Sequence, residues 1–202
     1  MNEFKLAEAS KEKTFVEVPE GTHAARLFGI IDLGLQSETE FGTGKPTKRS
    51  KILLQFEFVQ EFAGDGVTPL TLSHEVNAFL SEKSNLVAAL TALLGNSAKE
   101  ALSSGVSLTE VVGKFALATV GRTSSGRAKI TGFSSLPKAI KEADLLLTAK
   151  KELVTFDVDR PDLDVFNKLP AWVQKKIRAA HNAPVLPGND VPFDTNDLTT
   201  DF

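Results

Sequence analysis

Alternation of apolar and polar residues predicts strands in the first half of the chain. The segment 51–59, KILLQFEFV, places four apolar side chains on one face and Leu53, Gln55 and Glu57 on the other. This period of two is typical of a β-strand. The other strands predicted in this half lie at residues 16–34 and 70–78, with hairpin turn residues at 61–69.

The period of the apolar residues changes in the segment 84–94, SNLVAALTALL, and predicts a helix. Three leucines fall on one helical face. Ser84 has the side chain of an N-cap, and Gly95 follows as the residue that ends the helix. Beyond it the pattern predicts short helical turns at 98–103 and 108–112, and strands at 113–121 and 127–133 joined by the turn 122–126.

Three strands, a helical insertion and a closing hairpin follow one another, which is the element order of an OB-fold. We therefore predict a mainly β protein: an OB-fold, five-stranded Greek-key barrel with a helical insertion between strands 3 and 4 and a C-terminal helical extension. The extension contains a short strand at 153–158 and a helix at 170–180, with proline in its first turn. The predicted parts are a flexible N-terminal arm (1–13), the OB-fold (14–138), the extension (139–182) and a disordered acidic tail (183–202).

Basic residues gather in two segments that the predicted fold uses as binding loops. The segment 36–50 is rich in Gly, Ser and Thr, and predicts a long, mobile loop between the first two strands. The turn 122–126 joins the last two strands, and OB-folds hold oligonucleotides with these two loops. Solvated loops without a ligand are the alternative interpretation. The basic residues that we expect to contact DNA are Lys45, Lys48, Arg49, Lys51, Arg122, Arg127 and Lys129.

The aromatic composition restricts which side chains can stack on bases. The chain has 14 Phe, one Trp and no Tyr, and proteins that bind single strands combine a cationic groove with aromatic stacking platforms. Phe56 and Phe58 share a strand face with aliphatic residues, so we assign them to the core. Phe41 and Phe62 lie in or beside predicted loops, and we expect these two to stack on bases.

The segment 189–202, NDVPFDTNDLTTDF, holds four acids and no base, and it ends in phenylalanine. Without these four acids the chain has 22 acids against 23 bases, so its net negative charge comes from this segment. Phenylalanines among acids fit a peptide that partner proteins bind, and the same acids can compete with phosphates for a basic groove. A solvated terminus without a partner is the alternative. The residues of this predicted docking tail are Asp190, Phe193, Asp194, Asp197, Asp201 and Phe202.

Catalytic and metal-binding patterns are scarce. The chain has no cysteine, which excludes disulfides and thiolate zinc sites, and it has no metalloprotease, P-loop or serine-hydrolase motif. The acidic segment 157–164, DVDRPDLD, lacks the glycine and terminal glutamate of a calcium loop. We therefore expect no enzyme, no cofactor and no metal. Because no apolar run is long enough to span a membrane and no secretory signal is evident, we expect a cytoplasmic protein without a membrane partner.

Five segments resemble one family of nucleic-acid-binding proteins. They are VPEGTHAARLFGIIDLGLQ, KILLQFEF, LSEKSNLVAALTALLG, VGKFALATVGRTSSGRAKITGFSSLPK and ELVTFDVDRPDLDVFNKLPAWVQKKI, and together they cover about residues 18–180. The family that they resemble is the single-stranded DNA-binding proteins encoded by tailed bacteriophages, which have an OB-fold core. The segment VPFDTNDLTTDF resembles the acidic, Phe-ended tails of replicative single-strand binders. The shortage of Tyr and Trp departs from many such proteins.

The resemblance implies a protein that coats and protects single-stranded DNA, with tolerance for its sequence, in phage replication and recombination in a bacterial cytoplasm. We expect single-stranded DNA as the main partner, duplex DNA as a weaker one, and replication or recombination proteins as partners of the tail. Two alternatives stay open. One is a non-enzymatic phage adaptor or structural protein that uses an OB-like barrel for protein contacts. The other is an enzyme, such as a nuclease accessory subunit, which no constellation of residues supports.

Overall fold

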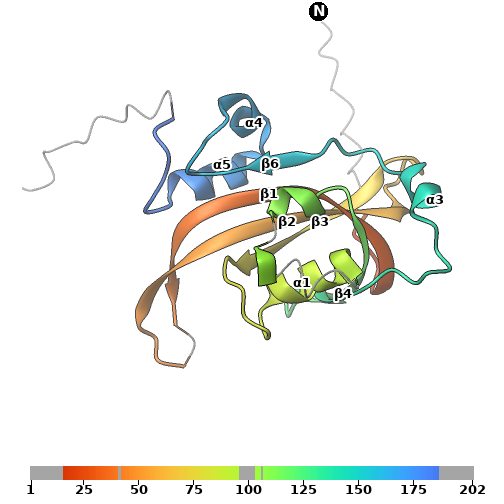
Figure 1. Ribbon diagram of the computed structural model, residues 1–202, viewed down its shortest axis with the longest axis horizontal. Helices are drawn as coiled ribbons and strands as arrows, with labels where there is room; N and C mark the ends of the chain where they lie inside the picture. Colours follow the sequence, from red (N-terminus) through yellow and green to blue (C-terminus); the bar gives the residue numbers. More distant parts are fainter. Residues whose placement is uncertain (1–15, 41, 96–102, 106, 187–202) are drawn as a thin grey trace, which may run out of the picture.

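The computed structural model describes residues 16–40, 42–95, 103–105 and 107–186. It is mainly β, as the sequence predicts, with six strands in one sheet and short helices (Figure 1). The strands are β1 (Gly21–Thr39), β2 (Pro46–Phe62), β3 (Pro69–Asn77), β4 (Phe115–Arg122), β5 (Ala128–Ser134) and β6 (Val154–Phe156). The helices are α1 (Asn85–Leu94), the 3-10 helix η2 (Leu108–Val111), α3 (Glu142–Leu146), α4 (Leu163–Lys168) and α5 (Ala171–Arg178).

The sheet has the order β3-β2-β1-β4-β5, and each neighbouring pair on this path is antiparallel. β1 pairs with β2 along most of its length, while its first residues also pair with β4 and its middle pairs in parallel with β6. β3 and β5 end the path, and no ladder joins them within the described residues. The sheet is therefore open, and backbone pairing does not close the predicted five-stranded barrel.

Side chains bring the two end strands of the sheet close to each other. The ring centroid of Phe133 on β5 lies 5.2 Å from that of Phe56 on β2 and 5.6 Å from that of His74 on β3. Aromatic pairs at such distances add to the hydrophobic stabilisation of a core. Packing of β5 against β3 thus encloses the inner face of the sheet without a backbone ladder between them.

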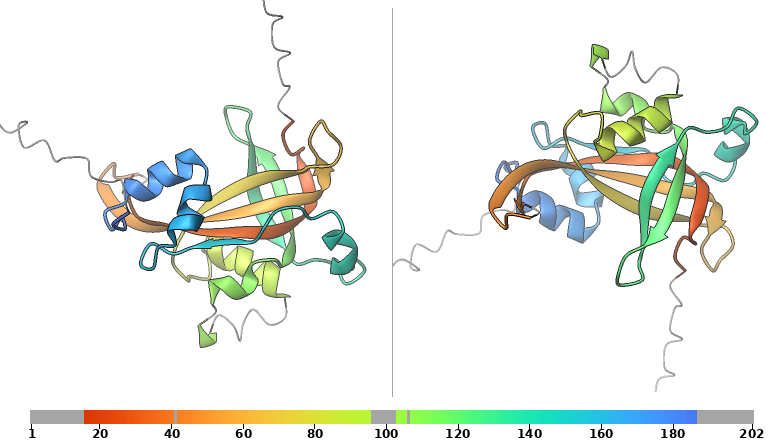
Figure 2. Two further views of the ribbon diagram at one scale, coloured as in Figure 1. Left: turned by 90° about the horizontal axis from the view of Figure 1, so that it is seen from above. Right: turned by 90° about the horizontal axis from the view of Figure 1, so that it is seen from below.

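Both faces of the sheet are covered. α1 lies on one face, and α4 and α5 lie on the other, while β6 runs beside β1 within the sheet (Figures 1 and 2). β2 is buried from Lys51 to Val59 because both of its faces are covered, and its side chains enter three hydrophobic clusters, the smallest of which holds Val59 with Leu145 of α3. Phe56 and Phe58 point to the core under α1, which confirms their assignment, while Leu53 enters the second core with residues of the extension. That second core contains Ile31, Leu33, Leu53, Phe156, Val158, Phe166, Leu169, Val173, Ile177 and Leu186.

The helix predicted at 84–94 is confirmed as α1, together with both of its end signals. The Ser84 hydroxyl accepts a hydrogen bond from the Val87 N–H at 3.1 Å, which satisfies one of the unpaired amides of the first turn. Gly95 ends the helix with a positive φ of 58°, which is accessible to glycine without steric cost. The helix predicted at 170–180 is likewise confirmed as α5.

The long loop predicted at 36–50 is wrong. β1 continues to Thr39 and β2 begins at Pro46, so the segment 36–50 is mostly strand and the turn of the β1–β2 hairpin is short. Glu40 and Lys45 close this turn with a backbone hydrogen bond of 2.8 Å. The Ser and Thr residues that suggested a loop are compatible with strands, and pairing with β1 decides their conformation. The hairpin extends beyond the helices on one side of the molecule (Figures 1 and 2).

Before α4, the extension contains one short helix and one short strand. Residues 139–150 contain the short helix α3, and the strand predicted at 153–158 is present as β6. Leu186, which the sequence places in the acidic tail, is 3% exposed and packs in the second core. Leu186 therefore packs with the extension, while the neighbouring Val185 is 97% exposed.

Candidate nucleic-acid interface

Of the four predicted DNA-contacting residues on the β1–β2 hairpin, two are ion-paired with acids and two are not. Lys45 and Lys48 are exposed, and neither forms an ion pair with an acid of the described residues. Arg49 lies 3.5 Å from Glu38, and the buried Lys51 pairs with the same carboxylate. Only the first two lysines are thus available to phosphates.

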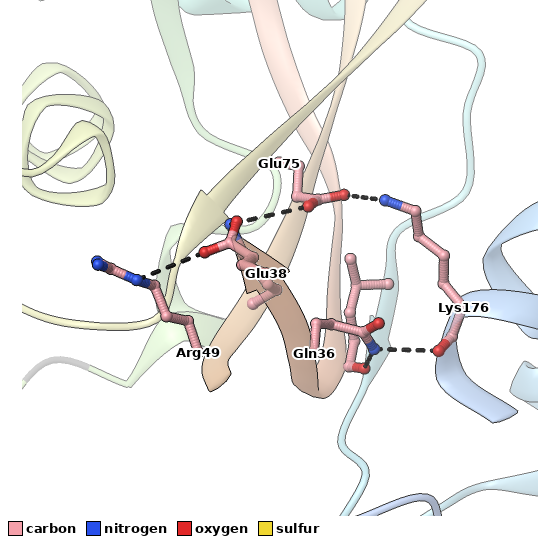
Figure 3. A network of polar contacts seen from close by, with 7 residues as sticks. Gln36, Glu38, Arg49, Glu75 and Lys176 are labelled. Atoms are coloured by element: carbon pink, nitrogen blue, oxygen red, sulfur yellow. Dashed lines mark hydrogen bonds and ion pairs between the residues drawn. The ribbon is translucent and has the colours of Figure 1, made fainter. Parts of the chain in front are cut away.

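The acids that neutralise Arg49 and Lys51 belong to a network that joins the hairpin to α5 (Figure 3). Lys51 Nζ lies 4.0 Å from Glu75 on β3, and Glu75 also pairs with Lys176 on α5. Acids and bases alternate along this chain of contacts, so its charges largely cancel. The network links α5 to β3, and it pairs two of the predicted cations of the candidate interface with acids.

The predicted DNA-contacting residues on the β4–β5 hairpin also include both ion-paired and unpaired side chains among the described residues. Arg122 pairs with Glu17 and lies 3.4 Å from Glu20, so its charge is compensated. Arg127 and Lys129 are exposed and form no ion pair among the described residues. The turn that carries Arg127 lies near the start of β1, whereas the turn of the β1–β2 hairpin lies at its end. The fold therefore does not bring the two groups of cations together.

A buried ion pair holds the extension over the outer face of β2. Glu57, which is 0% exposed, accepts hydrogen bonds from Arg26 Nε at 2.5 Å and from the backbone N–H groups of Lys150 and Lys151 at 3.0 and 3.1 Å. Arg26 in turn donates to the Lys151 carbonyl. The outer face of β2 is consequently closed to ligands, while Thr71, Ser73 and Glu75 on the outer face of β3 remain exposed.

A groove of about 890 Å³ opens beside the first half of β3, and we call it the β3 groove. Three side chains in it suit a nucleic acid: Arg127 from the β4–β5 hairpin, Lys151 from the extension and Trp172 from α5. Both cations are exposed, and the indole is 48% exposed. The remaining lining residues are Val16, Glu17, Val18, Ala63, Gly64, Thr68, Pro69, Leu70, Thr71, Leu72 and Ala128.

Of the two predicted stacking residues, only Phe62 belongs to the described residues, and it does not line this groove. Phe41 lies outside the described residues, and Phe62 is half-buried at the end of β2, opposite Pro69 of the groove wall. The sequence reasoning missed Lys151 and Trp172. The signal for Trp172 was present: Val173 and Ile177 form the apolar stripe of the 170–180 helix, and Trp172 lies beside that stripe. The tail residues Asp190, Phe193, Asp194, Asp197, Asp201 and Phe202 lie outside the described residues.

A second cavity, of about 820 Å³, has the wrong charge for a nucleic acid. Asp32, Asp157, Asp159 and Asp162 line it, and Arg160 is the one base among the described residues that line it. Among the described residues no cluster of His, Asp or Glu has an arrangement that could hold a metal ion. Burial of Asp32, with smaller contributions from the charges of Asp157 and Asp159, raises the pKa of its carboxyl above the ordinary value of 3.8.

Asp32→Asn is expected to stabilise the protein at neutral pH. A raised folded-state pKa means that ionised Asp32 destabilises the fold at high pH, and that protonation relieves this cost as the pH falls through the folded pKa towards 3.8. The gain in melting temperature should therefore be present at pH 7 and shrink towards pH 4. Thermal unfolding at several pH values measures it, with the exposed Glu82→Gln as the control. A pH-independent gain would contradict this interpretation.

His23 and His74 have structural surroundings. His23 Nδ1 lies 2.9 Å from Glu61, and its Nε2 lies 3.1 Å from the Pro19 carbonyl oxygen. Burial lowers the pKa of His74, which packs against Phe133. Neither of these two sites contains a nucleophile. His181 Nε2 lies 2.8 Å from the Ser37 hydroxyl oxygen at an exposed position.

No protein-family model matches the chain, and no curated protein matches it. In the described residues, no helix is both long and apolar enough to cross a bilayer. The fold and the β3 groove define the molecule at the level of a mainly β protein with an open, partly cationic groove.

Proposed function

We propose that this protein binds single-stranded DNA with tolerance for its sequence and has no catalytic activity of its own. The observation that carries the proposal is the β3 groove, an open groove beside the exposed face of β3 with Arg127 and Lys151 on its walls. Cations along such a groove neutralise phosphates and release counterions, and this supplies affinity that does not depend on sequence.

The proposal includes an OB-fold for the sheet and α1. The strand order β3-β2-β1-β4-β5 and the position of α1 between β3 and β4 support it. The contact of Phe133 with His74 across the open edge supports it as well, because OB-folds are partly open Greek-key barrels. In that fold the exposed face of β3 and the two hairpins are the parts that meet an oligonucleotide.

The biological role that we propose is coating and protection of single-stranded DNA during phage replication and recombination in a bacterial cytoplasm. Duplex DNA would be the weaker ligand, because its bases are already stacked and paired. The acidic segment 189–202 would dock replication or recombination proteins and compete with DNA for the groove. Its four acids and its phenylalanines support this part of the proposal.

Fluorescence anisotropy with a labelled oligo-dT tests the proposal. The full chain should bind it, and the affinity should fall steeply as salt is raised. The double variant Arg127→Ala/Lys151→Ala, which removes both cations of the groove walls, should weaken binding to dT and dA oligonucleotides alike. It should also lower the salt slope by about 1.4, because each phosphate contact on a single strand contributes about 0.7.

Lys168→Ala is the matched control, since it removes an exposed cation of α4 that does not line the groove. Its affinity and salt slope should equal those of the wild type. No binding by the wild-type chain at low salt would overturn the proposal and favour the alternative of a protein that makes only protein contacts.

A further inference from the structure

The indole of Trp172 is exposed, although the fold does not require an exposed aromatic side chain at this position. It lies in the first turn of α5, the helix that the second core holds through the fully buried Val173 and Ile177. These two residues form the buried stripe, and Trp172 points away from it into the β3 groove, with 48% of its surface exposed. Tryptophan usually buries most of its large apolar surface. A half-exposed tryptophan in a groove therefore indicates a surface available to a ligand.

The backbone that carries this indole is held on several sides. Gln174 Nε2 donates to the Leu169 carbonyl at 2.8 Å, and Gln36 Nε2 donates to the Lys176 carbonyl at 3.0 Å (Figure 3). The guanidinium of Arg178 lies 4.8 Å from the ring centroid of Phe166, a distance typical of a cation–π contact. An aromatic platform on a fixed helix loses little conformational entropy when a ligand stacks on it.

The surroundings of Trp172 fit a nucleotide better than an apolar ligand. Lys151 and Arg127 line the same groove and are exposed. Lys175, one helical turn after Trp172, is exposed on the same side of α5 and forms no ion pair among the described residues. An aromatic face with cations around it matches a base flanked by its phosphates.

We propose that Trp172 is a base-stacking residue of the β3 groove, so that the C-terminal extension is part of the DNA-binding site. This inference rests on the proposed function and deepens it. Stacking requires an open base face, and bases in a duplex are covered by their neighbours. Trp172 would thus make the groove prefer unpaired bases, a selectivity that the cations alone do not supply.

The intrinsic fluorescence of the full chain gives a direct test, because Trp172 is the single tryptophan and there is no tyrosine. Titration with oligo-dT should quench the emission in parallel with the rise in anisotropy of a labelled copy. An abasic oligonucleotide of the same length should raise anisotropy through its phosphates but leave the emission nearly unchanged.

Two variants complete the test. Trp172→Ala should weaken binding of oligo-dT roughly 5- to 150-fold, with an unchanged salt slope because no phosphate contact is removed. Trp172→Phe, which keeps an aromatic ring, should recover part of the loss and controls for damage to the fold.

These measurements distinguish a wrong assignment of Trp172 from a wrong proposed function. Wild-type binding of dT without quenching, together with wild-type affinity in Trp172→Ala, would overturn the assignment of Trp172 and leave the proposed function intact. No binding of any oligonucleotide by the wild type would overturn both.

Discussion

Glu57→Gln should lower the free energy of unfolding by about 3–5 kcal/mol, the range for breaking one side of a buried ion pair. The Glu57 carboxylate is fully buried and accepts from Arg26 and from the backbone N–H groups of Lys150 and Lys151. A neutral amide has a single acceptor oxygen, and its NH₂ group would face a donor. The Arg26 charge would then remain buried without a counter-charge.

Urea unfolding and thermal melting measure this effect. A loss of that size corresponds to a fall in melting temperature of about 6–20 °C for a chain of this length. Glu20→Gln is the matched control, because its ion pair with Arg122 is mostly exposed and should contribute less than about 1 kcal/mol. Equal effects of the two substitutions would show that the buried pair does not hold the extension on the sheet.

Phe166→Ala should have a comparably large effect, about 3–5 kcal/mol, but a different distribution over the molecule. Phe166 is 1% exposed in the second core, where its ring centroid lies 5.8 Å from that of Phe156. The first core under α1 does not include it. The cavity should therefore loosen β6, α4 and α5, while the sheet and α1 keep their packing.

Hydrogen exchange resolved by residue tests this distribution. Amide protection should fall at Val173 and Ile177 of α5 and stay near the wild-type level at Leu90 of α1. Leu90→Ala, in the first core, is the control that should weaken α1 directly. Uniform loss of protection in Phe166→Ala would mean that the two cores unfold as one unit.

These two predictions bear on the same question, because Glu57 and Phe166 hold the segments that bring Lys151 and Trp172 to the β3 groove. If the extension is part of the DNA site, its packing determines the geometry of that site. Stability of the second core and affinity for single strands should then change together in variants of the extension. Affinity changes without loss of stability are expected only from residues that touch the ligand.

Local sequence patterns were sufficient to predict several strands and helices. The alternation in 51–59 predicted β2, and the helix 84–94 was predicted together with its cap and its end residue. These features depend on residues within a few positions of one another, and a cap or a period can be read without knowing the rest of the fold. The prediction failed at 36–50, where residues without a strong preference became strand through pairing with β1.

The sequence by itself determined the mainly β character of this protein, the position of α1 and α5, and the supply of basic residues in two hairpins. The tertiary structure decided which of those residues are available. Lys51 is compensated by Glu38 and Glu75, while Arg127 stays exposed beside Trp172 in the β3 groove. The tertiary structure also decided the surroundings of Glu57, whose carboxylate accepts hydrogen bonds from backbone N–H groups 93 and 94 positions away in the sequence. Such contacts join residues far apart in the chain, and no local period carries that information, because it arises only when the elements pack.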